Sequence, residues 1–126
     1  MKRCWIGFGL LLVLLVICLL VTFAMTRLHE NMETDLKQAA HYALSGNWNN
    51  AELYTNKARR SWEKWAHFRA CFADHTPMEE IDADFEALAV YLQAKEEVSF
   101  PATCLSLSRQ VAAVGEAHAL VWWNFF

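Results

Sequence analysis

The N-terminal part of the chain is one uninterrupted apolar run. Residues Trp5 to Ala24 include no charged side chain, and charges resume at Arg27. Because a helix rises about 1.5 Å per residue, about 20 residues cross the hydrocarbon core of a bilayer. The run predicts a transmembrane signal-anchor over residues 1–27, followed by a helical domain over residues 28–126. A cleaved signal peptide, whose apolar region is about 7–15 residues long, is the alternative.

Helical periodicity continues through the rest of the chain, where Gly and Pro are scarce and no strand-like alternation is bounded by turns. We expect helices over about 28–44, 48–72, 76–95 and from 99 onward, with the first able to continue from the span. Ser45-Gly46-Asn47 is predicted to end the first helix, and Asn47 to cap the second. Thr76-Pro77-Met78-Glu79 has the residue types of a capping box. The predicted fold class is all-α, an N-terminal transmembrane helix followed by a small antiparallel bundle of about four helices.

Each of the last three predicted helices has an apolar stripe, in which residues recur at three, four or seven positions. The stripes are Ala51, Tyr54, Ala58, Trp62, Trp65 and Phe72; Met78, Ile81, Phe85, Leu88 and Leu92; and Leu107, Val111, Val114, His118 and Val121. Gly115 interrupts the last helix, at a cost of about 1 kcal/mol relative to Ala. We expect this glycine to let another helix approach closely.

The distribution of charge predicts the orientation of the chain and argues against two kinds of main partner. Lys2 and Arg3 precede the span, so the positive-inside rule places the N-terminus in the cytoplasm and the helical domain outside. Without these two residues, nine Lys and Arg stand against 14 Asp and Glu, a net charge near −5. This balance argues against nucleic acid or anionic lipid as the main partner. The expected location is the cell membrane, as a single-pass protein.

Acidic residues and one histidine cluster at the start of the third predicted helix. They are His75, Glu79, Glu80, Asp82 and Asp84, which are metal-ligand types. No His-Glu-x-x-His motif or paired Glu-x-x-His motif accompanies them. We therefore interpret Glu79 as a cap and the others as residues that favour the helix N-terminus or face solvent. A metal site is the alternative interpretation, and no metal ligand or cofactor is predicted.

The pattern lacks the motifs of an enzyme. No nucleophile elbow, phosphate-binding glycine loop or Cys-x-x-Cys pair occurs, and Glu116 and His118 point apart on a helix. His118 lies on an apolar stripe, which favours a hydrogen-bonded core histidine. We predict no catalytic residue. Cys71 and Cys104 are interpreted as buried free thiols, with a single disulfide between them as the alternative.

Charged residues and aromatic residues of the helical domain each have more than one interpretation. A basic stripe on the second predicted helix consists of Lys57, Arg60 and Lys64. An antiparallel hairpin of the second and third predicted helices would bring Arg69 near Glu79 or Glu80. The alternative is that the acidic residues form a surface that binds a partner. Trp48, Trp62 and Trp65 are expected in the core of the bundle. Trp122, Trp123, Phe125 and Phe126 seal the end of the bundle, contact the membrane interface or bind a partner.

Three segments of the chain resemble a known family. They are Gly46-Asn47-Trp48-Asn49-Asn50-Ala51, Trp62-Glu63-Lys64-Trp65, and His75 followed by Glu79-Glu80-Ile81-Asp82. The resemblance, over about Leu28 to Leu92, is to domain-of-unknown-function family 4363, small single-span helical membrane proteins of Gram-positive bacteria. It implies a location in the bacterial envelope. The family has no established activity, so the resemblance implies no catalytic residue or cofactor.

These observations favour a membrane-anchored, non-enzymatic protein-interaction module at the cell envelope, with an unidentified protein partner. The alternative is a ligand- or metal-sensing envelope domain, which the cluster from His75 to Asp84 motivates. A hydrolase ranks third.

Overall fold

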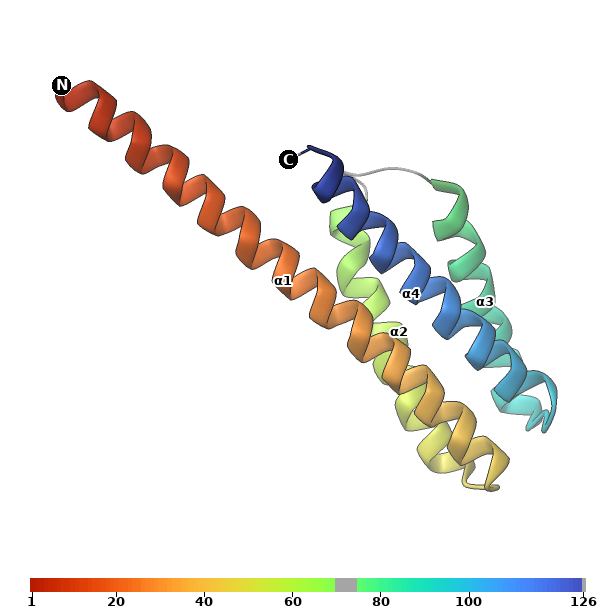
Figure 1. Cartoon of the computed structure of the whole chain (residues 1–126). Helices are drawn as coiled ribbons and strands as arrows, with labels where there is room; N and C mark the ends of the chain where they lie inside the picture. The colour runs from red at the N-terminus through yellow and green to blue at the C-terminus, as the bar shows by residue number, and fades with distance from the viewer. Residues whose placement is uncertain (70–74, 126) are drawn as a thin grey trace.

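The computed structural model describes the backbone over residues 1–69 and 75–125, and the side chains over 1–65 and 78–116. Within these residues the chain forms four α-helices and no strand: α1 Lys2–Leu44, α2 Trp48–Arg69, α3 His75–Ala94 and α4 Ser99–Phe125. The helices alternate in direction, with α1 packed against α2 and α4, and α3 against α4 (Figure 1). The predicted all-α antiparallel bundle is confirmed, and the second half of α1 is one of its four helices.

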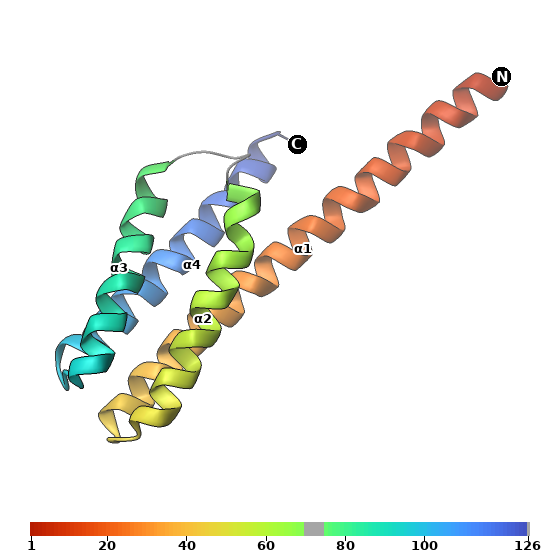
Figure 2. The same cartoon turned by 180° about the vertical axis from the view of Figure 1, so that it is seen from behind.

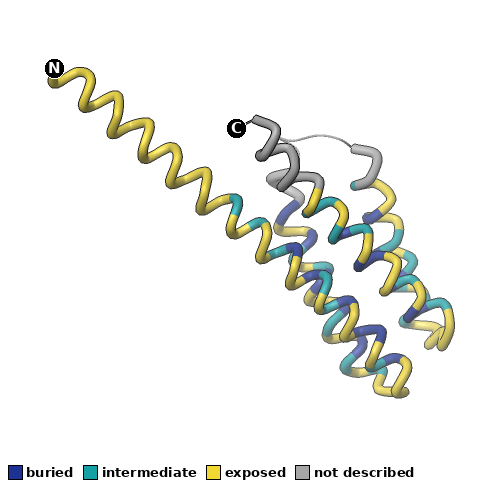
Figure 3. The backbone as a smooth tube through the Cα atoms, viewed as in Figure 1, coloured by how far each residue is buried: buried dark blue, intermediate teal, exposed yellow. Residues whose placement is uncertain are grey.

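Helix α1 is 43 residues long and has two different halves (Figure 3). Residues 1–21 are all exposed, whereas His29 begins a series of buried side chains that continues to Ala43. By length and composition, α1 is apolar and long enough to cross a membrane. The helix passes residues 27 and 28 without a break, as the sequence allowed. The division into an anchor and a separate domain stays a prediction.

The turn between α1 and α2 follows the predicted chemistry. Gly46 has a φ of 78°, its N–H donates to the Ala43 carbonyl at 3.1 Å, and the Asn47 N–H donates to the Tyr42 carbonyl at 2.9 Å. These two bonds form the Schellman motif, in which glycine adopts the left-handed conformation without a Cβ penalty. The Asn50 N–H then donates to the Asn47 side-chain oxygen at 3.3 Å, so the predicted N-cap is confirmed.

The turn after α3 has the same geometry without a glycine. Lys95 has a φ of 50°, its N–H donates to the Leu92 carbonyl at 3.2 Å, and the Glu96 N–H donates to the Tyr91 carbonyl at 3.0 Å. A lysine in the left-handed region is strained by about 1 kcal/mol, because its Cβ crowds the following carbonyl. The hydrogen bonds of the motif and the packing of α3 on α4 offset this strain.

The core changes in character along the bundle. Near the turn at Gly46, α1 and α2 pack through small side chains, among them Ala39, Ala43 and Ala51, which let the two backbones approach closely. Toward the opposite end, Trp62 and Trp65 of α2 fill the space between the helices, which lie further apart there (Figure 2). The core is completed by Met32, Leu36, Ala40, Ala58, Ile81, Phe85, Leu88, Phe100, Cys104, Leu107 and Val111.

The predicted apolar stripes are confirmed where side chains are described. Tyr54, Met78, Leu92 and Val114 are half-buried at the edge of the core, as is Trp48. The predictions for Phe72, His118 and Val121, and for the Thr76 and Pro77 positions of the capping box, lie outside the described side chains.

Candidate functional site

Helices α1 and α4 approach each other closely at Gly115. A Cβ placed on Gly115 would lie 3.3 Å from both Cβ and Cγ of His29. The His29 ring is 5% exposed, its Nδ1 is 2.7 Å from the Met25 carbonyl oxygen, and it packs edge-on against Trp65 with ring centroids 4.9 Å apart. The predicted role of Gly115 is thereby confirmed, and the approaching helix is α1.

The acidic residues at the start of α3 diverge. Asp82 faces α2, where its Oδ1 accepts a hydrogen bond from the Trp62 indole N–H at 2.5 Å. Asp84 faces α4, where its Oδ2 accepts a hydrogen bond from the Gln110 side-chain amide at 2.8 Å. These two bonds join α3 to its neighbours. No group of three or more His, Cys, Asp or Glu side chains able to hold a metal occurs among the described side chains. His75, the histidine of the predicted cluster, lies outside them.

The basic stripe of α2 is exposed and partly directed toward α1. The Lys57 ammonium lies 4.8 Å from the centre of the Tyr54 ring. Burial raises the pKa of Asp35 on α1, and the nearby charge of Lys57 partly opposes that increase. Arg60 and Lys64 are exposed. The predicted pairing of Arg69 with Glu79 or Glu80 stays a prediction, because the side chain of Arg69 lies outside the described residues.

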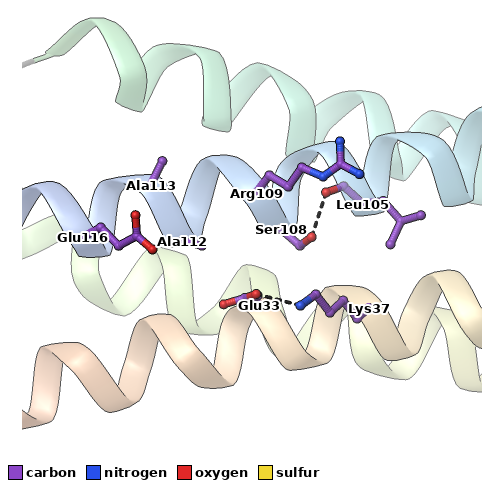
Figure 4. A pocket seen from close by; sticks show the side chains of 8 residues that line it. All are labelled: Glu33, Lys37, Leu105, Ser108, Arg109, Ala112, Ala113 and Glu116. Atoms are coloured by element: carbon purple, nitrogen blue, oxygen red, sulfur yellow. Dashed lines mark hydrogen bonds and ion pairs between the residues drawn. The ribbon is translucent and has the colours of Figure 1, made fainter.

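A groove of about 420 Å³ lies between α1 and α4 on the side away from the core (Figure 4). Small side chains of α4 contribute part of its lining, and charged side chains of both signs come from both helices. The lining residues are Glu33, Lys37, Leu105, Ser108, Arg109, Ala112, Ala113 and Glu116. Within it, Lys37 donates to Glu33 at 2.7 Å, and the Ser108 hydroxyl donates to the Leu105 carbonyl at 2.7 Å.

The sequence analysis did not identify this groove. Its one available signal is the series Ser108, Ala112 and Ala113, small residues beside the apolar stripe of α4. A helix partner can approach such a surface closely because no large side chain stands in the way.

Cys104 is a free thiol, fully buried in the core. Burial raises the pKa of Cys104 from its ordinary value of 9.0 to about 12, so the thiol is neutral and unreactive at neutral pH. This agrees with the expected buried free thiol. Cys71 lies outside the described residues, so its pairing stays a prediction.

The fold thus defines a four-helix bundle whose first helix carries a long exposed apolar extension. Residues 19–125 match the family described as Domain of unknown function (DUF4363), and the chain belongs to this family. The matched region includes the last residues of the apolar run and all of the bundle, which confirms the resemblance found in the sequence. No curated protein and no solved structure matches the chain.

Proposed function

We propose that this chain is a single-pass membrane protein of the cell envelope, and that its bundle is a non-enzymatic module for binding a protein partner. In this proposal the N-terminus is cytoplasmic and the bundle lies on the extracytoplasmic side of the membrane. The observation that carries the proposal is the unbroken α1. Its apolar half is exposed over residues 1–21 and suited to lipid, while its second half is packed in the bundle from His29 onward.

The proposal gives a reason for the length of α1. Only four residues, 25–28, separate the last residue of the apolar run from the first buried residue of the bundle, and they are helical. A continuous helix transmits orientation, whereas a flexible linker would not. The bundle would therefore be held at a fixed height and in a fixed orientation relative to its own span, which suits binding to a partner that is itself at the membrane.

The polar side chains near the core support a structural role over a catalytic one. Asp82 and Asp84 accept hydrogen bonds that join helices, and the thiol of Cys104 is buried. The ligand- or metal-sensing alternative has no contact in its favour among the described side chains.

The groove between α1 and α4 is the surface that best fits a protein partner. Arg109 and Glu116 are seven residues apart on α4 and expose opposite charges along one side. A partner helix with an acidic and a basic side chain about two turns apart, and small residues between them, would complement both.

Photo-crosslinking in cells tests the proposed partner surface. A photoreactive amino acid at Arg109 is expected to give adducts of defined mass in the membrane fraction, and the same residue at the exposed Asn56 of α2 is the matched control. Filling the groove with Ala113→Trp should abolish the adducts at Arg109. If the two positions give the same adducts, or if the adducts survive Ala113→Trp, the groove is not the binding surface. An adduct of twice the chain mass identifies a second copy as the partner.

A further inference from the structure

Helix α4 extends further toward the N-terminal half of α1 than the rest of the bundle does. The contact between His29 and Gly115 aligns these two antiparallel helices. Phe125, the last residue of α4, is ten residues beyond Gly115, so it lies about level with Leu19, ten residues before His29. In Figures 1 and 2 the C-terminal end of α4 is level with part of the N-terminal half of α1.

The described parts of the two other helices reach less far along α1. Trp65 packs against His29, so Arg69, where the described part of α2 ends, is about level with Met25. On the other side, the hydrogen bond between Asp84 and Gln110 aligns α3 with α4. Helix α3 begins at His75, nine residues before Asp84, so its first residue is about level with residue 119 of α4. Because Gly115 is level with His29, residue 119 of α4 is about level with residue 25 of α1. Helix α4 therefore continues about six residues, roughly 9 Å, past the start of α3.

The level of Arg69 and His75, the ends of the described parts of α2 and α3, is the level at which the apolar run of α1 ends. That run is Trp5 to Ala24, and Arg27 follows, with its guanidinium 5.2 Å from the centre of the Phe23 ring. An arginine on an aromatic ring at the end of a span is typical of the headgroup region. Residues 120–125 of α4 are thus level with residues 19–24 of the apolar run.

The residue types of this segment suit lipid. Residues 120–125 are Leu-Val-Trp-Trp-Asn-Phe, and no Asp, Glu, Lys or Arg follows Glu116. Tryptophan is enriched where the hydrocarbon of a bilayer meets its headgroups, because its ring is apolar and its indole N–H is a donor. The side chains beyond Glu116 are outside the described residues, and the level of the segment follows from the course of the helix alone.

We propose that the last turns of α4, residues 120–125, insert into the membrane interface beside α1 and form a second contact between the bundle and the lipid. This rests on the proposed function, in which α1 spans the bilayer. A single helix leaves a bundle free to rotate and tilt about the span. A second contact, through α4, restricts both the rotation and the tilt of the bundle. It thereby fixes the orientation of the groove between α1 and α4 relative to the membrane.

Depth measurements with a nitroxide label test the proposal. The full chain, with Cys4, Cys18 and Cys71 replaced by alanine and the unreactive Cys104 kept, is labelled at Phe125→Cys in phosphatidylcholine vesicles that contain phosphatidylglycerol. Collisions with oxygen, which dissolves in lipid, are compared with collisions with a water-soluble nickel chelate. Leu15→Cys is the control within the span, and Val98→Cys, 79% exposed between α3 and α4, is the control in water. We expect an oxygen-to-nickel ratio at Phe125 that is several-fold above that at Val98 and below that at Leu15, which is in the middle of the apolar run.

The outcomes separate this proposal from the anchoring on which it rests. A water-like ratio at Phe125, or shielding from both reagents inside the bundle, with a lipid-like ratio at Leu15, overturns the insertion of α4 and leaves the anchor intact. A water-like ratio at Leu15 contradicts the anchor itself. As a second test, Trp122→Glu with Trp123→Glu should lower the ratio at Phe125 several-fold, whereas Val90→Glu, on the exposed face of α3, should not. An unchanged ratio in the double variant contradicts the proposal.

Discussion

Replacing Gly115 with alanine sets two effects of similar size against each other. In an open helix the replacement stabilises by about 1 kcal/mol, because alanine has the higher helix propensity. Here the new methyl group would lie 3.3 Å from Cβ and Cγ of His29. These atoms cannot rotate away, since Cβ is attached to the α1 backbone and the ring packs against Trp65. Relieving the contact requires α1 and α4 to separate by a few tenths of an ångström, and overpacking of this kind costs about 1–3 kcal/mol.

We therefore expect Gly115→Ala to leave the free energy of unfolding unchanged or to lower it by up to about 2 kcal/mol. The matched control is Ala113→Gly, two residues away on the exposed side of the same helix, which should lower it by about 1 kcal/mol. Gly115→Leu should destabilise more than either. The assay is urea denaturation of the full chain in detergent micelles, followed by tryptophan emission. If Gly115→Ala stabilises the protein by as much as Ala113→Gly destabilises it, the close approach at His29 is refuted.

Three further predictions use single contacts, each measured by the same denaturation assay. Trp62→Phe and Asp82→Ala should show a coupling of about 1 kcal/mol in a double-mutant cycle, since the indole N–H donates to that carboxylate, and additive effects would argue against the bond. Lys95→Gly should stabilise by about 1 kcal/mol by removing the strained φ, and a loss of stability would contradict the turn geometry. Because the thiol of Cys104 ionises more readily when unfolded, stability should fall as pH rises from 9.0 toward 12, and more steeply than in Cys104→Ala; equal slopes would show that the thiol is not buried.

The helices and the first turn could be predicted because their signals are local. Residues 45–47 contain a glycine and an asparagine in the order that a Schellman motif and an N-cap require. Gly115 was predictable for a related reason, since a glycine inside a helix is costly unless another backbone needs the space. The turn at Lys95 gave no such signal, because lysine has no preference for the left-handed conformation that it adopts there.

The features of the site that were missed depend on which helices are neighbours. Asp82 and Asp84 belong to an acidic cluster in the sequence, yet they turn toward α2 and α4, and only the packing of the bundle determines those directions. Thr55 and Ser108 are buried although polar, because each hydroxyl donates to a carbonyl of its own helix at 2.8 Å and 2.7 Å. A pattern of polar and apolar positions assigns such residues to the surface.

The central claim is that α1 anchors the bundle on the extracytoplasmic side of the membrane, and the topology of the chain tests it most directly. Cysteines at Lys2 and Val98, in a variant that lacks Cys4, Cys18 and Cys71, are treated with an impermeant thiol reagent on intact cells. The account predicts labelling at Val98 but not at Lys2 before lysis, with the protein in the membrane fraction. Labelling at Val98 only after lysis would place the bundle in the cytoplasm and contradict the account.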